Sequence, residues 1–212
     1  MAETDIEFSS NGHTLVGMLN TPSSAVSHAA LLLHPHPRFG GSMDNLVVRE
    51  LEQIAIDSGM ATLRFNFRGA TSNPFSFDGV SGAVDDAMAA LNYMKKELGT
   101  ANLGLLGYSF GASVGLGVAA QERLSFLVCL SASYDIFLST GLKLDALSTI
   151  DCPVLLFHGM DDTVISPQDA DRFSYAVGSN SEVVQIADEG HFYQNSMNRV
   201  RIRIKDFLRA IL

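Results

Sequence analysis

A serine flanked by glycines stands where a predicted strand turns into a predicted helix. Residues 107–111 read Gly-Tyr-Ser-Phe-Gly, directly after an apolar run and at the start of a helix built from small residues. A sharp turn of this kind strains the serine backbone and lifts its hydroxyl above the sheet, and the glycines remove side chains that would clash. The free N–H groups at the start of the helix face the place where an oxyanion would develop. The spacing therefore predicts that Ser109 is a nucleophile.

A second serine matches the same pattern. Residues 111–115 read Gly-Ala-Ser-Val-Gly, which places Ser113 one turn inside the predicted helix. Small residues at that place allow close packing of the helix against a strand. We therefore expect Ser113 to be structural.

An acid and a base each follow a predicted strand further along the chain. Asp162 comes just after the apolar strand 153–158, and His191 comes after the β-branched run 183–186. A serine hydroxyl is a poor nucleophile until a base takes its proton, and a carboxylate must hold that imidazole in the required tautomer. These needs predict a triad of Ser109, His191 and Asp162.

Two other acids are alternatives to Asp162. Asp161 precedes it directly, and Asp135 follows the predicted strand 125–131. Each would also lie just past the end of a strand.

The loop 34–41, which reads His-Pro-His-Pro-Arg-Phe-Gly-Gly, leaves the third predicted strand. The second donor of an oxyanion hole comes from such a loop, and the first comes from the residue after the nucleophile. Because Pro37 has no N–H, we expect the backbone N–H groups of His36 and Phe110 to hold the oxyanion. A metal site at His34 and His36 is an alternative, although no acidic or cysteine motif of zinc-site spacing accompanies them.

The hydrophobic pattern predicts the scaffold that must position these residues. Several apolar runs are nearly continuous, as is typical of parallel strands covered on both faces. Strands are expected at 28–34, 60–67, 101–108, 125–131, 153–158 and 183–186, after an antiparallel start at 5–8 and 14–19. Helical stripes are expected near 47–55, 80–98, 111–120 and 197–211. The alternation predicts one domain, 1–212, with a doubly wound, mostly parallel α/β sheet whose chemistry lies beyond the carboxyl ends of the strands.

Details of two connections are also predicted. Asp44 is expected to cap the helix that starts near residue 47, and Gly59 to end it. The connection 132–152 has room for one short helix, with an apolar face of four leucines, at positions 138, 142, 144 and 147. No inserted lid is expected there, so the site should be open and favour short acyl groups.

Composition restricts the possible partners. The 212 residues carry a net charge of −9, which disfavours a nucleic-acid partner. No apolar stretch approaches the roughly 18 residues of a membrane span, and the acidic start of the chain lacks the features of a secretion signal. Cys129 and Cys152 are expected to be buried thiols, which favours a cytoplasmic protein. The basic cluster at 199–205 is interpreted as a solvated helix end.

Three polar residues belong to the predicted strand 60–67 and the turn after it. Arg64 alternates with apolar residues, so we expect it to pair internally. Asn66 and Arg68 lie nearer the predicted mouth of the site, and their roles stay open.

The whole set of motifs resembles the small cap-less α/β-hydrolases, described as dienelactone-hydrolase-like or carboxylesterase-like. The segments that carry the resemblance cover nearly the whole chain in order: HPHPRFGGSMDN, LRFNFRG, GYSFGAS, HGMDD and EGHF. The order serine, aspartate, histidine is that of the α/β-hydrolase triad, and the family spacing H-G-x-x-D falls on Asp162. The sequence departs from the pattern at Thr71, where relatives often carry a glycine, and at Ala83, where they often carry a glutamate.

The resemblance implies a serine hydrolase that cleaves a small-molecule carboxylic ester or thioester through an acyl-enzyme, without a metal or organic cofactor. Acyl transfer or peptide hydrolysis could use the same residues. An alternative of another class is a small-molecule receptor or scaffold that keeps the hydrolase fold but has little turnover. The glycine-rich turn does not fit phosphate binding, because the G-x-x-x-x-G-K pattern is absent.

Overall fold

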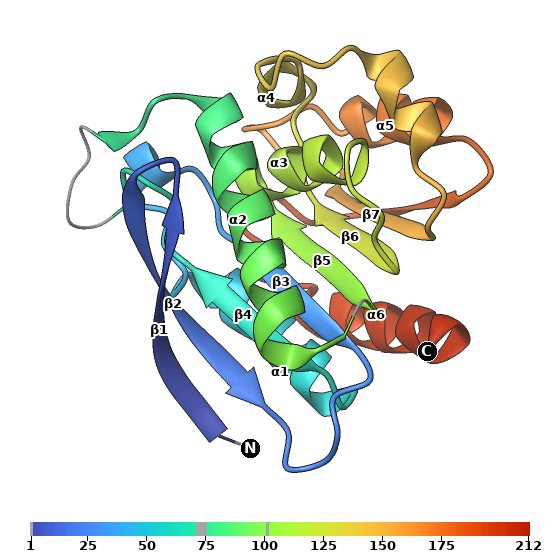
Figure 1. Cartoon of the computed structure of the whole chain (residues 1–212). Helices are drawn as coiled ribbons and strands as arrows, with labels where there is room; N and C mark the ends of the chain where they lie inside the picture. Colours follow the sequence, from blue (N-terminus) through green and yellow to red (C-terminus); the bar gives the residue numbers. More distant parts are fainter. Residues whose placement is uncertain (1, 71–75, 101) are drawn as a thin grey trace.

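One eight-stranded sheet organises the chain (Figure 1). The structure is a computed structural model that describes residues 2–70, 76–100 and 102–212. In space the strands follow the order β1-β2-β4-β3-β5-β6-β7-β8. Their bounds are β1 (Ala2–Ser10), β2 (His13–Thr21), β3 (Ala29–Leu33), β4 (Ala61–Phe65), β5 (Leu103–Tyr108), β6 (Phe126–Leu130), β7 (Val154–Gly159) and β8 (Ser181–Ile186). The pairs β1–β2 and β2–β4 are antiparallel and the remaining pairs are parallel, so the predicted fold class is confirmed.

Helices cover both faces of the sheet (Figure 1). One face carries α1 (Leu46–Asp57) and α6 (Met197–Ile211). The other carries α2 (Val80–Leu98), α3 (Phe110–Ala119), α4 (Tyr134–Leu138), α5 (Gln168–Val177) and the 3₁₀ turn η3 (Leu144–Thr149). In β3, Leu31 packs on the α2–α3 side and Leu32 on the α1–α6 side, which explains why this strand is apolar at every position.

The start of α1 differs from the prediction by one residue. Asn45, not Asp44, caps the helix, because its Oδ1 accepts a hydrogen bond from the N–H of Val47 at 3.0 Å. Asp44 instead receives a hydrogen bond of 2.9 Å from the guanidinium of Arg64. Gly59 follows the helix with φ of 82°, as expected of a glycine that ends it.

The connection 132–152 forms two short helical segments, α4 and η3, rather than one helix. Gly141 lies between them with φ of 87°, a conformation that would not continue α4. Leu147 is fully buried whereas Leu138 is 40% exposed, so the four leucines do not share one buried face. Both segments pack on neighbouring helices, α3 and α5.

The basic side chains of α6 bind neighbouring elements. Arg201 pairs with Glu50 of α1, and Lys205 donates a hydrogen bond of 2.7 Å to Asp57, the last residue of α1. The predicted solvated end is therefore partly a contact between α6 and α1. Cys129 and Cys152 are buried free thiols, as predicted. Among the described helices, none has the length and apolarity needed to cross a bilayer.

Candidate active site

Ser109 occupies a strained turn between β5 and α3. Its φ of 55° and ψ of −116° lie outside the regions that non-glycine residues favour. A Cβ atom at Gly107 would lie 2.5 Å from the carbonyl oxygen of Gly111, and one at Gly111 would lie 2.2 Å from that of Leu33. The two glycines therefore let the backbone pack closely enough to hold the serine at this turn.

The structure brings Ser109, His191 and Asp162 into one chain of hydrogen bonds. The Nε2 atom of His191 lies 3.0 Å from Ser109 Oγ, and its Nδ1 atom lies 2.8 Å from Asp162 Oδ2. All three residues are buried at the ends of β5, β7 and β8. Because Nδ1 faces a carboxylate, it carries the proton, which leaves Nε2 as an acceptor toward the serine hydroxyl.

Two histidines and two backbone N–H groups hold Asp162 in place, and hydrogen bonds from these groups lower its pKa. Its Oδ1 atom accepts hydrogen bonds from the N–H groups of Val164 at 2.8 Å and Ile165 at 2.9 Å. Burial alone raises the pKa of Asp162, but hydrogen bonds from His158, His191 and the Ile165 N–H outweigh it and hold that pKa far below its usual value.

Neither alternative acid reaches His191. The side chain of Asp161 is exposed, and its backbone N–H donates to the carbonyl of Glu189 at 2.9 Å. Asp135 is exposed in the first turn of α4.

A second histidine contacts the same carboxylate, and the sequence reasoning did not identify it. His158 is fully buried near the end of β7, with Nε2 3.2 Å from Asp162 Oδ2. Its Nδ1 atom has no hydrogen-bond partner within the described residues. The only signal in the sequence is its position four residues before Asp162, at the start of the H-G-x-x-D spacing. His158 therefore helps to orient the carboxylate from behind.

The loop that carries His191 is held by its own carboxylate and by the sheet. Glu189 accepts hydrogen bonds from the N–H groups of Gly190 at 3.0 Å and Asn195 at 2.9 Å. The phenol of Tyr108 donates to the carbonyl of His191 at 3.0 Å. These contacts fix the backbone on both sides of the imidazole.

Ser113 lies inside α3, away from the imidazole. It is fully buried, its hydroxyl donates to the carbonyl of Ser109 at 3.3 Å, and it accepts from the N–H of Ser133 at 2.8 Å. The hydroxyl is used to join α3 to the segment before α4, which fits the structural role expected of it.

Phe110 and His36 lie beside the serine. Phe110 is the first residue of α3, so its N–H has no acceptor within the helix. Its ring packs 4.7 Å from the imidazole of His36, centre to centre. The loop after His36 curls back on it, since the N–H groups of Phe39 and Gly41 both donate to the His36 carbonyl.

A cavity of about 290 Å³ opens over these groups. Ser109, His191 and His36 lie on its wall. Its rim is apolar and exposed: Phe39 is 87% exposed, and Phe192 is 63% exposed. The candidate site is therefore an open cavity that brings Ser109, His191 and His36 together with exposed aromatic side chains.

His34 is a structural residue and not a metal ligand. Its Nδ1–H donates to the carbonyl of Pro35 at 2.6 Å, and its Nε2 accepts from the N–H of Phe67 at 3.0 Å. Both ring nitrogens are thus occupied, which argues against the alternative metal site with His36. Burial lowers the pKa of His34 to about 4, with a smaller effect from His36 in the same direction.

The lowered pKa of His34 predicts a loss of stability in mild acid. The unfolded chain binds a proton at this histidine below about pH 6.5, whereas the folded chain does so only below about pH 4. The contribution of His34 to the free energy of unfolding is therefore fully present above about pH 6.5. That free energy falls by up to about 3 kcal/mol as the pH drops to about 4. Urea unfolding at several pH values measures this change. His34→Gln, which cannot titrate, should reduce the slope, and an equal slope in both proteins would contradict the assignment.

Polar residues near β4 are structural. Arg64 is buried and paired with Glu52 at 3.0 Å, as expected. Arg68 is buried and paired with Asp86 at 2.6 Å, and Asn66 accepts from the N–H of Met43 at 2.9 Å. These contacts give Asn66 and Arg68, whose roles the sequence left open, a part in joining neighbouring segments.

Two departures from the family pattern remain. Ala83 of α2 is buried in the hydrophobic core of the domain, and Arg68 pairs with Asp86 of the same helix. Thr71 lies outside the described residues.

Comparisons with known proteins identify the family of the chain. The sequence model of the dienelactone hydrolase family matches residues 70–201. An uncharacterised protein of Rickettsia prowazekii (strain Madrid E) is 30% identical over 193 residues, which cover 86% of this chain and 79% of the relative.

Solved structures with the same fold include an α/β serine hydrolase homologue from Coxiella burnetii, at 26% identity and a TM-score of 0.85 over 98% of each chain. An α/β serine hydrolase without a lid from Xanthomonas campestris is 25% identical, with a TM-score of 0.84 over 99% of this chain and 95% of that one. The resemblance to cap-less α/β-hydrolases is thereby confirmed. The chain is a hydrolase and belongs to the dienelactone hydrolase family.

Proposed function

We propose that the protein hydrolyses a carboxylic ester or thioester of a small molecule through an acyl-enzyme on Ser109. The observation that carries this proposal is the unbroken chain of hydrogen bonds from Asp162 through His191 to Ser109. A neutral imidazole that faces the hydroxyl with a free acceptor is the arrangement that makes serine nucleophilic.

The reaction proceeds in two halves. In the first, Ser109 Oγ bonds to the carbonyl carbon while His191 Nε2 takes the hydroxyl proton and the carbonyl oxygen becomes an oxyanion. Collapse of this intermediate breaks the bond to the leaving oxygen or sulfur, which takes the proton from Nε2. In the second half a water molecule repeats these steps on the acyl-serine and releases the acid. Asp162 stabilises the imidazolium formed in each half.

The oxyanion is held by the backbone N–H groups of Phe110 and His36 in this proposal. The start of α3 supports the first donor, and the place of His36 on the cavity wall beside Ser109 supports the second. Each such donor contributes a factor of about 10² to 10³ in kcat. Because the chain's own groups handle every proton and charge, the cycle invokes no metal or organic cofactor.

Hydrolysis of p-nitrophenyl acetate, together with labelling by a fluorophosphonate, tests the proposed function. We expect release of nitrophenolate and a covalent label. A folded protein that binds small esters but neither turns them over nor accepts the label would contradict the proposal and favour the receptor alternative.

The absence of a helical lid in the described connection between β6 and β7 predicts a preference for short acyl groups. With α4 and η3 packed on neighbouring helices, little binding energy from a long acyl chain can assist the chemistry. Across p-nitrophenyl esters of about two to sixteen acyl carbons, kcat/KM should be highest at the short end, with no activation at a lipid interface. A maximum at the long end would require an acyl pocket. Residues 71–80 are the candidate segment for such a pocket, and 71–75 of them lie outside the described residues.

A further inference from the structure

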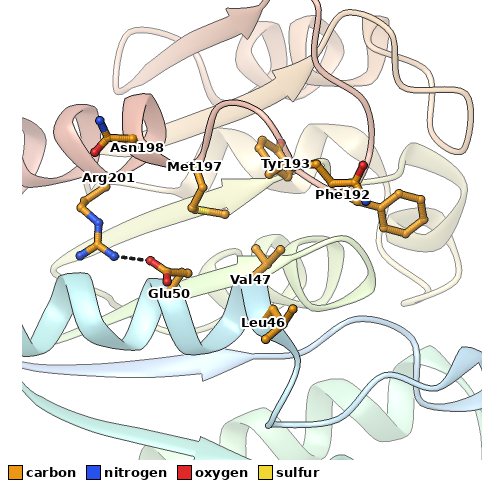
Figure 2. A pocket seen from close by; sticks show the side chains of 9 residues that line it. Leu46, Val47, Glu50, Phe192, Tyr193, Met197, Asn198 and Arg201 are labelled. Carbon is orange, nitrogen blue, oxygen red and sulfur yellow. Dashed lines mark hydrogen bonds and ion pairs between the residues drawn. The ribbon is translucent and has the colours of Figure 1, made fainter.

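A second and larger cavity lies next to the catalytic one. Its volume is about 460 Å³, and it lies between the first turn of α1 and the start of α6 (Figure 2). We call it the outer groove, and four apolar side chains on its wall define it: Leu46, Val47, Phe192 and Met197. Nothing in the mechanism above uses this groove.

The outer groove continues the catalytic cavity. Phe192 lines both, and it directly follows His191 in the chain. On the opposite wall Asn45 lines the catalytic cavity while its neighbour Leu46 lines the groove. A molecule attached at Ser109 can therefore extend between Asn45 and Phe192 into the groove.

The chemistry of the groove changes along its length. Near the catalytic cavity its walls are apolar, and two large apolar side chains there, Leu46 at 82% and Phe192 at 63%, are exposed on the same groove, as in a binding patch. At the far end Arg201 pairs with Glu50, as the dashed line in Figure 2 shows. Because this cation is already paired, the groove favours an uncharged, apolar occupant over an anion.

Proton transfer decides which half of an ester extends this way. The leaving oxygen must take its proton from His191 Nε2, so the leaving alcohol lies against the imidazole. The oxyanion side of the intermediate faces Phe110 and His36 instead. The wall next to His191 is Phe192, which opens into the groove.

We infer that the outer groove binds the alcohol part of the substrate, and that this part is an apolar alkyl or aryl alcohol. This inference rests on the proposed function and adds its substrate class: esters with a small acyl group and a larger apolar alcohol. It agrees with the preference for short acyl chains, because the extended part of the substrate leaves with the alcohol.

Hexyl acetate and ethyl hexanoate test the inference, because they are isomers with the same ester bond and similar intrinsic reactivity. We expect kcat/KM, measured by acid release in a pH-stat, to be higher for hexyl acetate by about tenfold or more. The estimate follows from about two- to fourfold for each methylene group that leaves water.

Two matched variants assign this preference to the groove. Leu46→Asp places a carboxylate on the apolar wall at the first position of α1, where an acid is compatible with the helix. It should lower the ratio of kcat/KM for hexyl acetate over ethyl acetate by about tenfold. Ile202→Asp adds the same charge at a 55% exposed residue of α6 outside the groove and should leave the ratio unchanged.

Three outcomes would overturn the inference. Faster hydrolysis of ethyl hexanoate, with sensitivity to Leu46→Asp, would place the acyl chain in the groove. An unchanged ratio in Leu46→Asp would show that the groove is not used, while the proposed function stands. If neither ester is hydrolysed in a manner that depends on Ser109, the proposed function itself fails, and the inference with it.

Discussion

Ser109→Ala is expected to abolish both ester hydrolysis and labelling by a fluorophosphonate, with a loss in kcat of about 10⁶-fold. The hydroxyl is the atom that forms the acyl-enzyme, and alanine offers His191 nothing from which to take a proton. The variant should still fold. The substitution removes only the hydrogen bond between Ser109 Oγ and His191. The backbone of the turn keeps the hydrogen bond of 2.8 Å from the N–H of residue 109 to the carbonyl of Leu130.

Ser113→Ala is the matched control for that experiment. It removes a buried acceptor from the N–H of Ser133, which costs about 1–3 kcal/mol of stability, but it leaves Ser109 in place. The label should therefore persist in Ser113→Ala. A folded Ser109→Ala protein that is still labelled would show that the nucleophile is another residue.

Asp162→Asn is expected to lower kcat by about 10⁴-fold through the tautomer of His191. The N–H groups of Val164 and Ile165 both point at Oδ1, so they hold the oxygen of an asparagine at that position. The amide NH₂ then faces His191 Nδ1. Because an NH₂ group only donates, Nδ1 must be unprotonated and accept this hydrogen bond. The proton consequently moves to Nε2, where it blocks transfer from Ser109.

The other two acids provide controls of the same chemistry. Asp161→Asn and Asp135→Asn change exposed carboxylates outside the hydrogen-bond chain, so kcat should stay near that of the wild type. Severe loss in Asp135→Asn together with near-normal activity in Asp162→Asn would move the acid to the segment after β6.

Sequence periodicity was sufficient for most of the scaffold. The nearly continuous apolar runs at β3, β5, β6 and β7 follow from burial on both faces, a property that each strand displays in its own residues. Predictions were less accurate where two neighbouring side chains could make the same hydrogen bond. Asn45 caps α1, whereas the carboxylate of Asp44 accepts a hydrogen bond from Arg64, a residue of β4.

The amino-acid sequence by itself determined the local chemistry of this protein. The glycines that flank Ser109 specify its turn, and the serine, the acid and the base follow one another in the chain in the order typical of the triad. The sequence favoured Asp162 as the acid, but only the tertiary structure excluded Asp161 and Asp135, and it alone showed that His158 contacts the same oxygen and that a groove extends past Phe192. The first and the third depend on residues far apart in the chain that meet within a few ångströms, and the second on how the turn after β7 folds back toward His158. Such distances are set by the packing of the whole sheet, and spacing along the chain does not encode them.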